Sequence, residues 1–258
     1  MAENRPLILV TNDDGITAPG ILALATEMSR LGEVWVVAPD SPQSGMGHAV
    51  TIGNILRMEE VDFPVEGVRA FSTSGTPVDC VKLAIYKILH RKPDLLVSGI
   101  NHGSNSSINV IYSGTMSAAV EGAVEGIPSV GLSLHDHARG ADFSASRDVA
   151  RRVARQVLSQ GLPAGTCLNV NIPKLPLAQI AGIRVCRQAA GHWDDAFVER
   201  ENPGGAKYYW MTGRFSTPDQ GQDTDEWALA QGYVSVVPTQ FDLTAHHAIA
   251  ALNTWDFT

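Results

Sequence analysis

The chain has 258 residues, of which 44% are hydrophobic and 18% are charged. This composition excludes a disordered or coiled-coil chain, and the length favours a single α/β domain with appendages over two equal domains. The formal net charge is -8, and no segment forms a stripe rich in lysine and arginine. We therefore expect no nucleic-acid polymer as a partner.

The N-terminus and the cysteines indicate a cytoplasmic protein. Met1–Pro6 leads straight into an apolar strand and lacks the hydrophobic region of a signal peptide. No segment approaches the ~20 apolar residues of a membrane-spanning helix, so we expect no membrane contact. Cys80, Cys167 and Cys186 are odd in number and widely spaced, which favours buried, reduced thiols over a disulfide framework.

Apolar runs and helical periodicity alternate along the first 160 residues. The predicted elements are a strand at 7–10, a helix at 19–31, a strand at 34–38, a helix at 77–90, a strand at 94–99, a helix at 115–125, a strand at 129–134 and a helix at 147–160. The first helix has Pro19 at its start and Gly32 just past its end, as helices commonly do. Strands that alternate with helices imply βαβ units and a mostly parallel sheet. The predicted fold class is α/β, with a Rossmann-like, doubly wound core.

The pattern changes after about Pro173. Short β-like pieces follow at 183–187, 207–213 and 233–238, separated by polar stretches at 202–205 and 216–225. We therefore divide the single domain of residues 1–258 into a catalytic core, 1–173, and a β-rich C-terminal extension, 174–258. The aromatic run Tyr208–Trp210 fits either a subunit contact, where such side chains are enriched, or a cap on the protein's own core.

Polar loops follow three of the predicted strands. The first strand ends in Asn12–Gly15, the second runs into a glycine-rich loop that ends at His48, and the strand at 94–99 continues into Gly99–Asn105. Open α/β sheets bind their ligands beyond the carboxyl ends of the strands. We therefore expect the three loops to converge on one rim of the sheet.

Asp13 and Asp14 are the residues that say most about chemistry. Two adjacent carboxylates at a strand end repel one another, and a hard divalent cation relieves that repulsion because Mg²⁺ and Mn²⁺ prefer oxygen ligands. An isolated Asp-Asp-Gly also fits a turn or a helix cap. The serine- and asparagine-rich loops of the neighbouring strands favour the metal site.

Two segments open predicted helices with hydroxyl groups. Ser113–Ser117 presents hydroxyls and free backbone N–H groups at a helix N-terminus, an arrangement that binds phosphate, although an ordinary cap has the same residues. Gly75–Asp79 is similar, and there we interpret Thr76 as a structural N-cap.

At these positions the sequence resembles the SurE family, the survival proteins that act as 5′/3′-nucleotidases. The matching segments are Ile8–Gly15, Val36–Asp40, Ser44–His48, Gly75–Cys80, Val97–Asn101 and Tyr112–Thr115, with a looser likeness at Tyr208–Trp210 and Gly232–Pro238. The first six stand in the family's order within the first 135 residues.

The resemblance implies one divalent metal ion per subunit, Mg²⁺ or Mn²⁺, and a metal site made of Asp13, Asp14, Ser44 and Asn101. The predicted substrate-binding residues are Asn12, Gly45, Ser113, Gly114 and Thr115, of which the resemblance places the last three around the phosphate. It also implies a homodimer or homotetramer with exchanged C-terminal arms. No role is carried onto His102 or Ser106–Ser107.

The predicted function is a divalent-metal-dependent phosphatase that hydrolyses nucleoside 5′-monophosphates to nucleoside and phosphate, with 3′-monophosphates left open as further substrates. Asp13 and Asp14 are the predicted catalytic residues, because the metal they hold would activate a water for attack in line with the departing ribose oxygen. The general base and the preferred nucleotide stay open.

Other polar clusters are interpreted as structural. His135 and His137 lack further ligands at zinc-site spacing, and His246–His247 is expected on the surface. His48 either approaches the site or packs its own loop. The acidic runs interpreted as solvated surface are Asp194–Asp195 and Asp223–Glu226.

Three other functional classes fit the sequence less well. A dinucleotide-dependent dehydrogenase needs G-x-G-x-x-G in the first strand–helix turn, where this chain has Asp13–Gly20. A serine hydrolase using Ser44 or Ser113 needs G-x-S-x-G, which surrounds neither serine, and it gives the two acids no role. A non-catalytic interaction protein would use the aromatic tail, and its signature would be loss of partners on deletion of residues 203–258.

Overall fold

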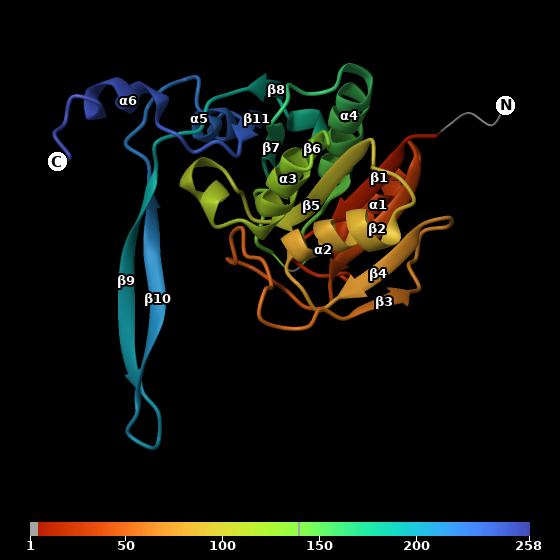
Figure 1. Ribbon diagram of the computed structural model, residues 1–258, viewed down its shortest axis with the longest axis horizontal. Helices are drawn as coiled ribbons and strands as arrows, with labels where there is room; N and C mark the ends of the chain where they lie inside the picture. The colour runs from red at the N-terminus through yellow and green to blue at the C-terminus, as the bar shows by residue number, and fades with distance from the viewer. Residues whose placement is uncertain (1–4, 139) are drawn as a thin grey trace.

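The structure is a computed structural model that describes residues 5–138 and 140–258 (Figure 1). Met1–Asn4, which belong to the segment predicted to lack a signal peptide, lie outside the described residues. None of the described helices is long and apolar enough to cross a membrane.

Nine strands form one sheet. In chain order they are β1 Leu7–Thr11, β2 Glu33–Pro39, β3 Met58–Val61, β4 Arg69–Thr73, β5 Leu95–His102, β6 Ser129–Leu134, β7 Thr166–Ile172, β8 Gly182–Val185 and β11 Tyr233–Gln240. Their order across the sheet is β3-β4-β2-β1-β5-β6-β7-β11-β8. The six strands from β4 to β7 run parallel, and taken in chain order they stand 3-2-1-4-5-6, the order of a doubly wound Rossmann sheet. The predicted fold class is confirmed.

Helices cover both faces of this sheet (Figure 1). Helices α1 (Pro19–Met28) and α4 (Ser144–Gln160) pack together on one face, and α2 (Pro77–Leu83) and α3 (Gly114–Val124) on the other. Ile21, Leu24 and Met28 of α1 are fully buried, because apolar residues at helical spacing form one stripe toward the sheet. A Cβ on Gly20 would clash with the backbone carbonyl of Ile100, so this glycine lets α1 lie close to β5.

Short helices complete the connections. They are η1 Ala84–Ile88, η2 Ser107–Ile111, η3 Leu177–Gln179, α5 Asp225–Ala230 and α6 His246–Leu252. The helix predicted at 77–90 is therefore α2 continued by η1. Thr76 is the N-cap predicted there, and it is part of a capping box in which the side chains of Thr76 and Asp79 each accept the other's backbone N–H.

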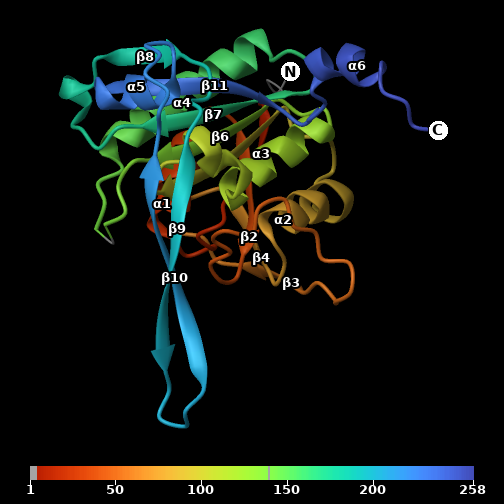
Figure 2. The same cartoon turned by 90° about the vertical axis from the view of Figure 1, so that its left-hand side faces the viewer.

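The C-terminal extension does not form a separate unit. Strand β11 pairs antiparallel with β7, and β8 pairs with β11, so two of its strands complete the main sheet. The remaining pair, β9 (His192–Glu201) and β10 (Lys207–Ser216), forms a two-stranded hairpin that projects far from the body in both views (Figures 1 and 2). Tyr208, Tyr209 and Trp210 lie on it with 44%, 57% and 63% of their surface exposed. The alternative that they cap the protein's own core is wrong.

Candidate active site

Strand β1 ends in a turn that leaves two carboxylates at the edge of the sheet. The Asn12 side chain closes this turn, accepting the N–H of Gly15 at 3.2 Å and donating to the Gly15 carbonyl at 2.9 Å. Asp13 and Asp14 lie within it. Because β1 and β5 are the neighbours at which the strand order reverses, the turn lies at the switch point of the sheet, where doubly wound folds bind their ligands.

Asp13 is a buried acid, with 4% of its surface exposed. Burial raises the pKa of its carboxyl to about 6, against the opposing hydrogen bond from Thr115 and with a further rise from the neighbouring Asp14. The Thr115 hydroxyl donates to Asp13 Oδ1 at 2.5 Å. Among the described residues, no lysine, arginine or histidine forms an ion pair with this acid.

The N-terminus of α3 abuts Asp13 directly. A Cβ on Gly114 would lie 2.7 Å from the Cβ of Asp13, so only glycine allows this approach. Ser113 is the N-cap, and its hydroxyl oxygen accepts the N–H of Met116 at 3.0 Å. The first N–H groups of a helix have no partner inside the helix. Here that of Thr115 faces the Asp13 carboxyl, and this helix end suits a bound anion.

The loop that carries Ser44 is held at both ends by main-chain groups. The N–H of Gln43 donates to the Asp13 carbonyl at 2.7 Å, and the N–H of Gly47 donates to the Tyr112 carbonyl at 3.1 Å. Gly45 and Gly47 have φ of 74° and 56°, in the left-handed region that favours glycine. Ser44 is thereby held between Asp13 and the start of α3.

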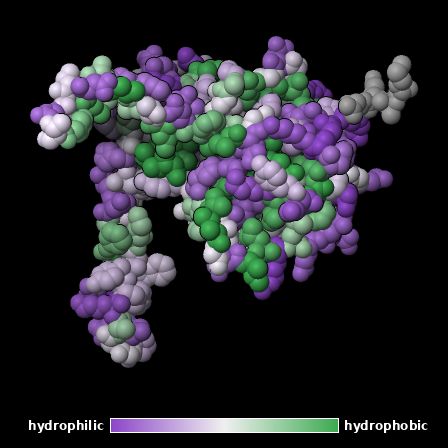
Figure 3. All heavy atoms as spheres, viewed as in Figure 1, coloured by the Kyte–Doolittle hydropathy of each residue, from purple (hydrophilic) through white to green (hydrophobic). Residues whose placement is uncertain are grey.

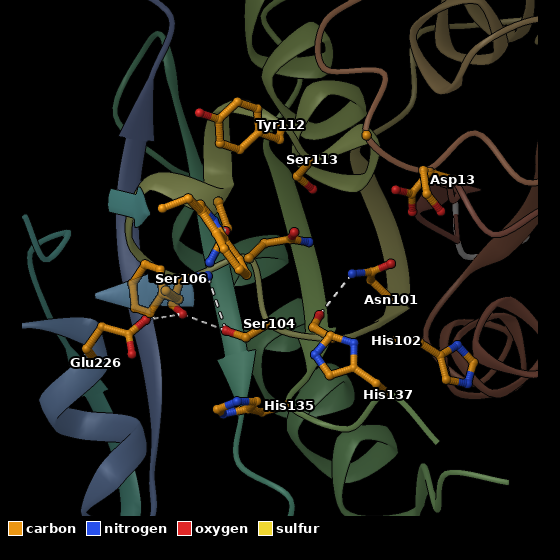
Figure 4. Close-up of a pocket in the computed structure, with 17 residues that line it drawn as sticks. Asp13, Asn101, His102, Ser104, Ser106, Tyr112, Ser113, His135, His137 and Glu226 are labelled. Atoms are coloured by element: carbon orange, nitrogen blue, oxygen red, sulfur yellow. Dashed lines mark hydrogen bonds between the residues drawn. The ribbon is translucent and has the colours of Figure 1, made fainter. Parts of the chain in front are cut away.

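Strand β5 contributes two further polar residues. It extends past its predicted end to His102, so Asn101 belongs to the strand and not to the loop. The Asn101 amide nitrogen donates to the Gly103 carbonyl at 2.9 Å, and Figure 4 shows its oxygen on the side of Asp13. His102 Nδ1 lies 3.3 Å from Asp14 Oδ2, which holds that carboxylate against β5.

A cavity of about 460 Å³ opens over these residues. Of the predicted site, Asp13, Ser44, Gly45, Asn101 and Ser113 lie on its wall. The remaining predicted residues are not on the wall: Asn12 lies in the turn, Asp14 contacts His102, and Gly114 and Thr115 contact Asp13. The described lining residues include no lysine or arginine.

The donor set of this corner suits a hard divalent ion. Carboxylate, hydroxyl and carboxamide oxygens are the ligands that Mg²⁺ and Mn²⁺ prefer. The buried carboxyl of Asp13, with histidines but no lysine or arginine on the described cavity wall, is the position that such an ion would compensate.

The comparison with protein families decides the class. The family model described as "Survival protein SurE" matches residues 8–195. The chain belongs to the SurE family.

Relatives along the full length of this SurE chain agree. A protein of Christiangramia forsetii named 5′-nucleotidase SurE is 62% identical over 256 residues, covering 99% of this chain and 98% of its own length. One of the same name from Flavobacterium psychrophilum is 58% identical and covers 98% of both chains. The crystal structure of the SurE protein from Aquifex aeolicus superposes with a TM-score of 0.83 at 38% identity, covering 96% of this chain and 98% of that one.

Some residues of the cavity wall in this SurE chain are not predicted from the sequence. Trp193 and Phe215, at the root of the hairpin, and Asn109 and Glu226 all line the cavity. They come from segments that no motif connects with Asp13. Tyr112, a further wall residue, did belong to a family-like segment and could have been included.

One acidic run was interpreted incorrectly. Asp223–Glu226 was expected to be solvated, but Asp225 is fully buried and accepts the N–H groups of Ser107 at 2.8 Å and Ala189 at 2.9 Å. Backbone donors from two loops compensate this buried charge. Asp194–Asp195 is exposed, as predicted.

The histidines that the sequence singles out lie in different environments. His48 lies 2.9 Å from Glu121 of α3 and is absent from the cavity wall, so it packs its loop. His246–His247 is exposed, as predicted. His135 and His137 line the cavity (Figure 4), but in the described part of the chain no three His, Cys, Asp or Glu side chains gather as a metal site.

Proposed function

We propose that this SurE-family protein is a 5′-nucleotidase, a divalent-metal-dependent phosphatase that converts nucleoside monophosphates to nucleoside and phosphate. The observation that carries the proposal is the buried Asp13 carboxyl set against the N-terminus of α3, in a cavity whose described wall has no lysine or arginine. The described wall does carry His102, His135 and His137, but next to the Asp13 carboxyl a metal ion is the stronger source of the positive charge that a phosphate dianion needs. The name of the full-length relatives supports the same activity.

Asp13, Asp14, Ser44 and Asn101 would hold one Mg²⁺ or Mn²⁺. When bound, the ion supplies charge neutralisation for the phosphate and a water of lowered pKa. The bound ion would compensate the charge of the buried Asp13 carboxylate, and His102 would keep the Asp14 carboxylate oriented.

The chain's own groups orient the substrate and stabilise the charge that develops. The backbone N–H of Gly114, at the positive end of the α3 dipole, donates to a phosphate oxygen as charge spreads onto it, while the hydroxyl and backbone N–H of Thr115 hold the Asp13 carboxyl. Ser113 and Gly45 line the cavity wall on either side of the proposed phosphate position. Attack by water occurs in line with the departing ribose oxygen. The turn closed by Asn12 fixes the Asp13 backbone.

The test is phosphate release from AMP and GMP by metal-stripped protein, before and after Mg²⁺ or Mn²⁺ is restored. We expect release only with metal, and its loss in Asp13→Asn. Asp62→Asn, at an exposed acid outside the cavity, serves as the matched control. Full turnover by the chelated enzyme, or by Asp13→Asn at saturating metal, would refute the proposal.

We also propose that residues 1–258 form one domain that assembles as a homodimer or homotetramer, with arms from residues 174–258 exchanged between subunits. The exposed aromatic side chains of β10 support it, as does an apolar groove lined by Ile111, Val124, Phe241 and Leu243. Figure 3 shows hydrophobic surface gathered over the η2 segment near the root of the hairpin. Light scattering should give a multiple of the 27.6 kDa chain, and a smaller mass for Trp210→Ser; a monomeric wild type would refute the assembly.

A cytoplasmic location is proposed on the basis of the cysteines. Cys80, Cys167 and Cys186 are all buried and unpaired, as thiols of proteins in reducing compartments are.

A further inference from the structure

The cavity extends well beyond the corner around Asp13. Its far walls come from η2, from the loop after β6, from the root of the β9–β10 hairpin and from the start of α5, and they include Trp193, Phe215 and Glu226. Figure 4 shows Glu226 at the opposite end from Asp13. If the proposed function holds, a nucleotide with its phosphate at Asp13 extends its nucleoside toward this far end.

The far end has an aromatic wall. The rings of Trp193 and Phe215 meet edge to face, with centroids 5.7 Å apart, and the Trp193 indole N–H donates to Asn109 Oδ1 at 2.8 Å, which fixes the ring. A Cβ on Gly191 would lie 2.6 Å from both the Phe215 ring and the Ser107 hydroxyl, so Phe215 lies against η2. Fixed aromatic rings are the surfaces on which proteins stack a nucleobase.

Glu226 lies at the same end because its neighbour is tied to η2. Buried Asp225 accepts the N–H of Ser107 at 2.8 Å, and Glu226 itself accepts the hydroxyl of Ser106 at 2.5 Å. Apart from Asp13, it supplies the one carboxylate among the described lining residues. An ionised carboxylate only accepts hydrogen bonds and has about four acceptor positions, of which the described structure fills one.

The Glu226 carboxylate has lost part of its water without gaining enough hydrogen-bond donors from the protein. This partial burial raises the pKa of Glu226, against the opposing hydrogen bond from Ser106. A ligand that offers further N–H donors would stabilise the charged form, since hydrogen bonds to the carboxylate compensate for its loss of water.

We propose that Glu226 is a specificity-determining residue whose carboxylate accepts the two adjacent N–H donors of the guanine edge, N1–H and N2–H, so that the enzyme prefers GMP to AMP. Adenine presents one donor and one acceptor on the same edge, and its N1 lone pair would face the carboxylate. A site built to accept from a substrate N–H rejects the analogue that lacks it, because the partly buried acceptor then loses water without gaining a donor.

The experiment compares kcat/KM for GMP, IMP and AMP in the wild type, Glu226→Gln and Glu59→Gln, with Mg²⁺ or Mn²⁺ present. Glu59 is an exposed glutamate on β3, outside the cavity. We expect wild type and Glu59→Gln to prefer GMP over AMP by roughly tenfold or more, with IMP between them because it keeps N1–H and lacks the N2 amine. Glu226→Gln should lower the GMP-to-AMP ratio roughly tenfold, since a carboxamide offers one donor and one acceptor and so suits adenine.

The ratio is insensitive to partial misfolding, because both substrates are measured on one preparation. Equal losses for GMP and AMP in Glu226→Gln would overturn the proposal and indicate contact with a group common to both, such as the ribose. A wild type that hydrolyses 4-nitrophenyl phosphate with metal, but treats GMP and AMP alike, would also overturn it while leaving the proposed function standing. If no phosphate ester is hydrolysed, the proposed function fails, and calorimetric binding of GMP against AMP by the same proteins decides this inference.

Discussion

Replacing Gly114 by alanine tests whether close contact between α3 and Asp13 builds the site. The new Cβ would lie 2.7 Å from Asp13 Cβ and 3.0 Å from its Oδ2. Restoring an ordinary carbon–carbon separation requires a shift of about 0.8 Å by the acid or by the helix start. A displacement of that size at a reacting centre lowers turnover on the order of 10²-fold.

The effect on stability should be smaller than the effect on activity. Overpacking costs about 1–3 kcal/mol, and alanine regains roughly 0.5–1 kcal/mol over glycine in a helix. A net cost of about 1 kcal/mol lowers Tm by roughly 2–4 °C in a chain of this size.

The assay is metal-dependent phosphate release together with thermal melting. Gly53→Ala is the matched control, because a Cβ there meets nothing within 4 Å. A Gly114→Ala protein with wild-type kcat/KM would refute the reasoning, and so would a loss of activity that merely tracks unfolding.

Three further substitutions have definite expected outcomes. Thr115→Val removes the hydroxyl bonded to Asp13, so calorimetry should show metal binding weakened by roughly tenfold; unchanged affinity would contradict the assigned contact. The hydrogen bond to His48 lowers the pKa of Glu121 in the folded protein. The ionised Glu121 therefore stabilises the fold at pH values above its unfolded pKa near 4.5. This stabilisation is lost as the pH falls through the lower pKa of the folded state. Urea unfolding should therefore show Glu121→Gln weaker than wild type by about 1–3 kcal/mol at pH 7, with the gap narrowing below pH ~4; a constant gap would exclude the charged bond. Gly20→Ala should cost about 1–3 kcal/mol through its clash with β5, and unchanged melting would show that α1 moves freely.

The parts of the fold that sequence predicts are those whose pattern is local. Strands β1, β2 and β6 are short apolar runs, buried on both faces, and such runs between helices indicate a parallel sheet. Asp13 and Asp14 were predicted to lie at the edge of the sheet because they directly follow one of these strands.

Strand β7 was missed because two of its buried residues are polar. Asn169 and Asn171 are 2% and 0% exposed. The Asn169 amide donates to the Asn105 carbonyl at 2.8 Å, and Asn171 Oδ1 accepts the Asn105 N–H at 2.7 Å. Buried amides are compatible with a strand interior when they are hydrogen-bonded, but their partner is more than 60 residues away in the chain, and nothing in the local pattern identifies it.

The same limit applies to the far end of the cavity. Glu226 is brought there by the bonds of Asp225 to Ser107 and Ala189, each from a different segment. In the sequence, Asp223–Glu226 has the composition of a solvated surface run. The side chains closest to the predicted metal could be found from strand ends, whereas those that contact the rest of a substrate depend on tertiary contacts.

The way in which the Ser44 loop is held determines how the site tolerates sequence change. Both of its anchors are backbone-to-backbone hydrogen bonds, at Gln43 and Gly47, so they do not depend on which side chains the loop carries. Gln43 and Met46 can therefore vary without displacing the serine, while the glycines cannot, since a left-handed residue with a side chain costs about 1–2 kcal/mol. Mutagenic libraries aimed at new substrates can therefore diversify Gln43 and Met46 while Ser44 keeps its place beside Asp13.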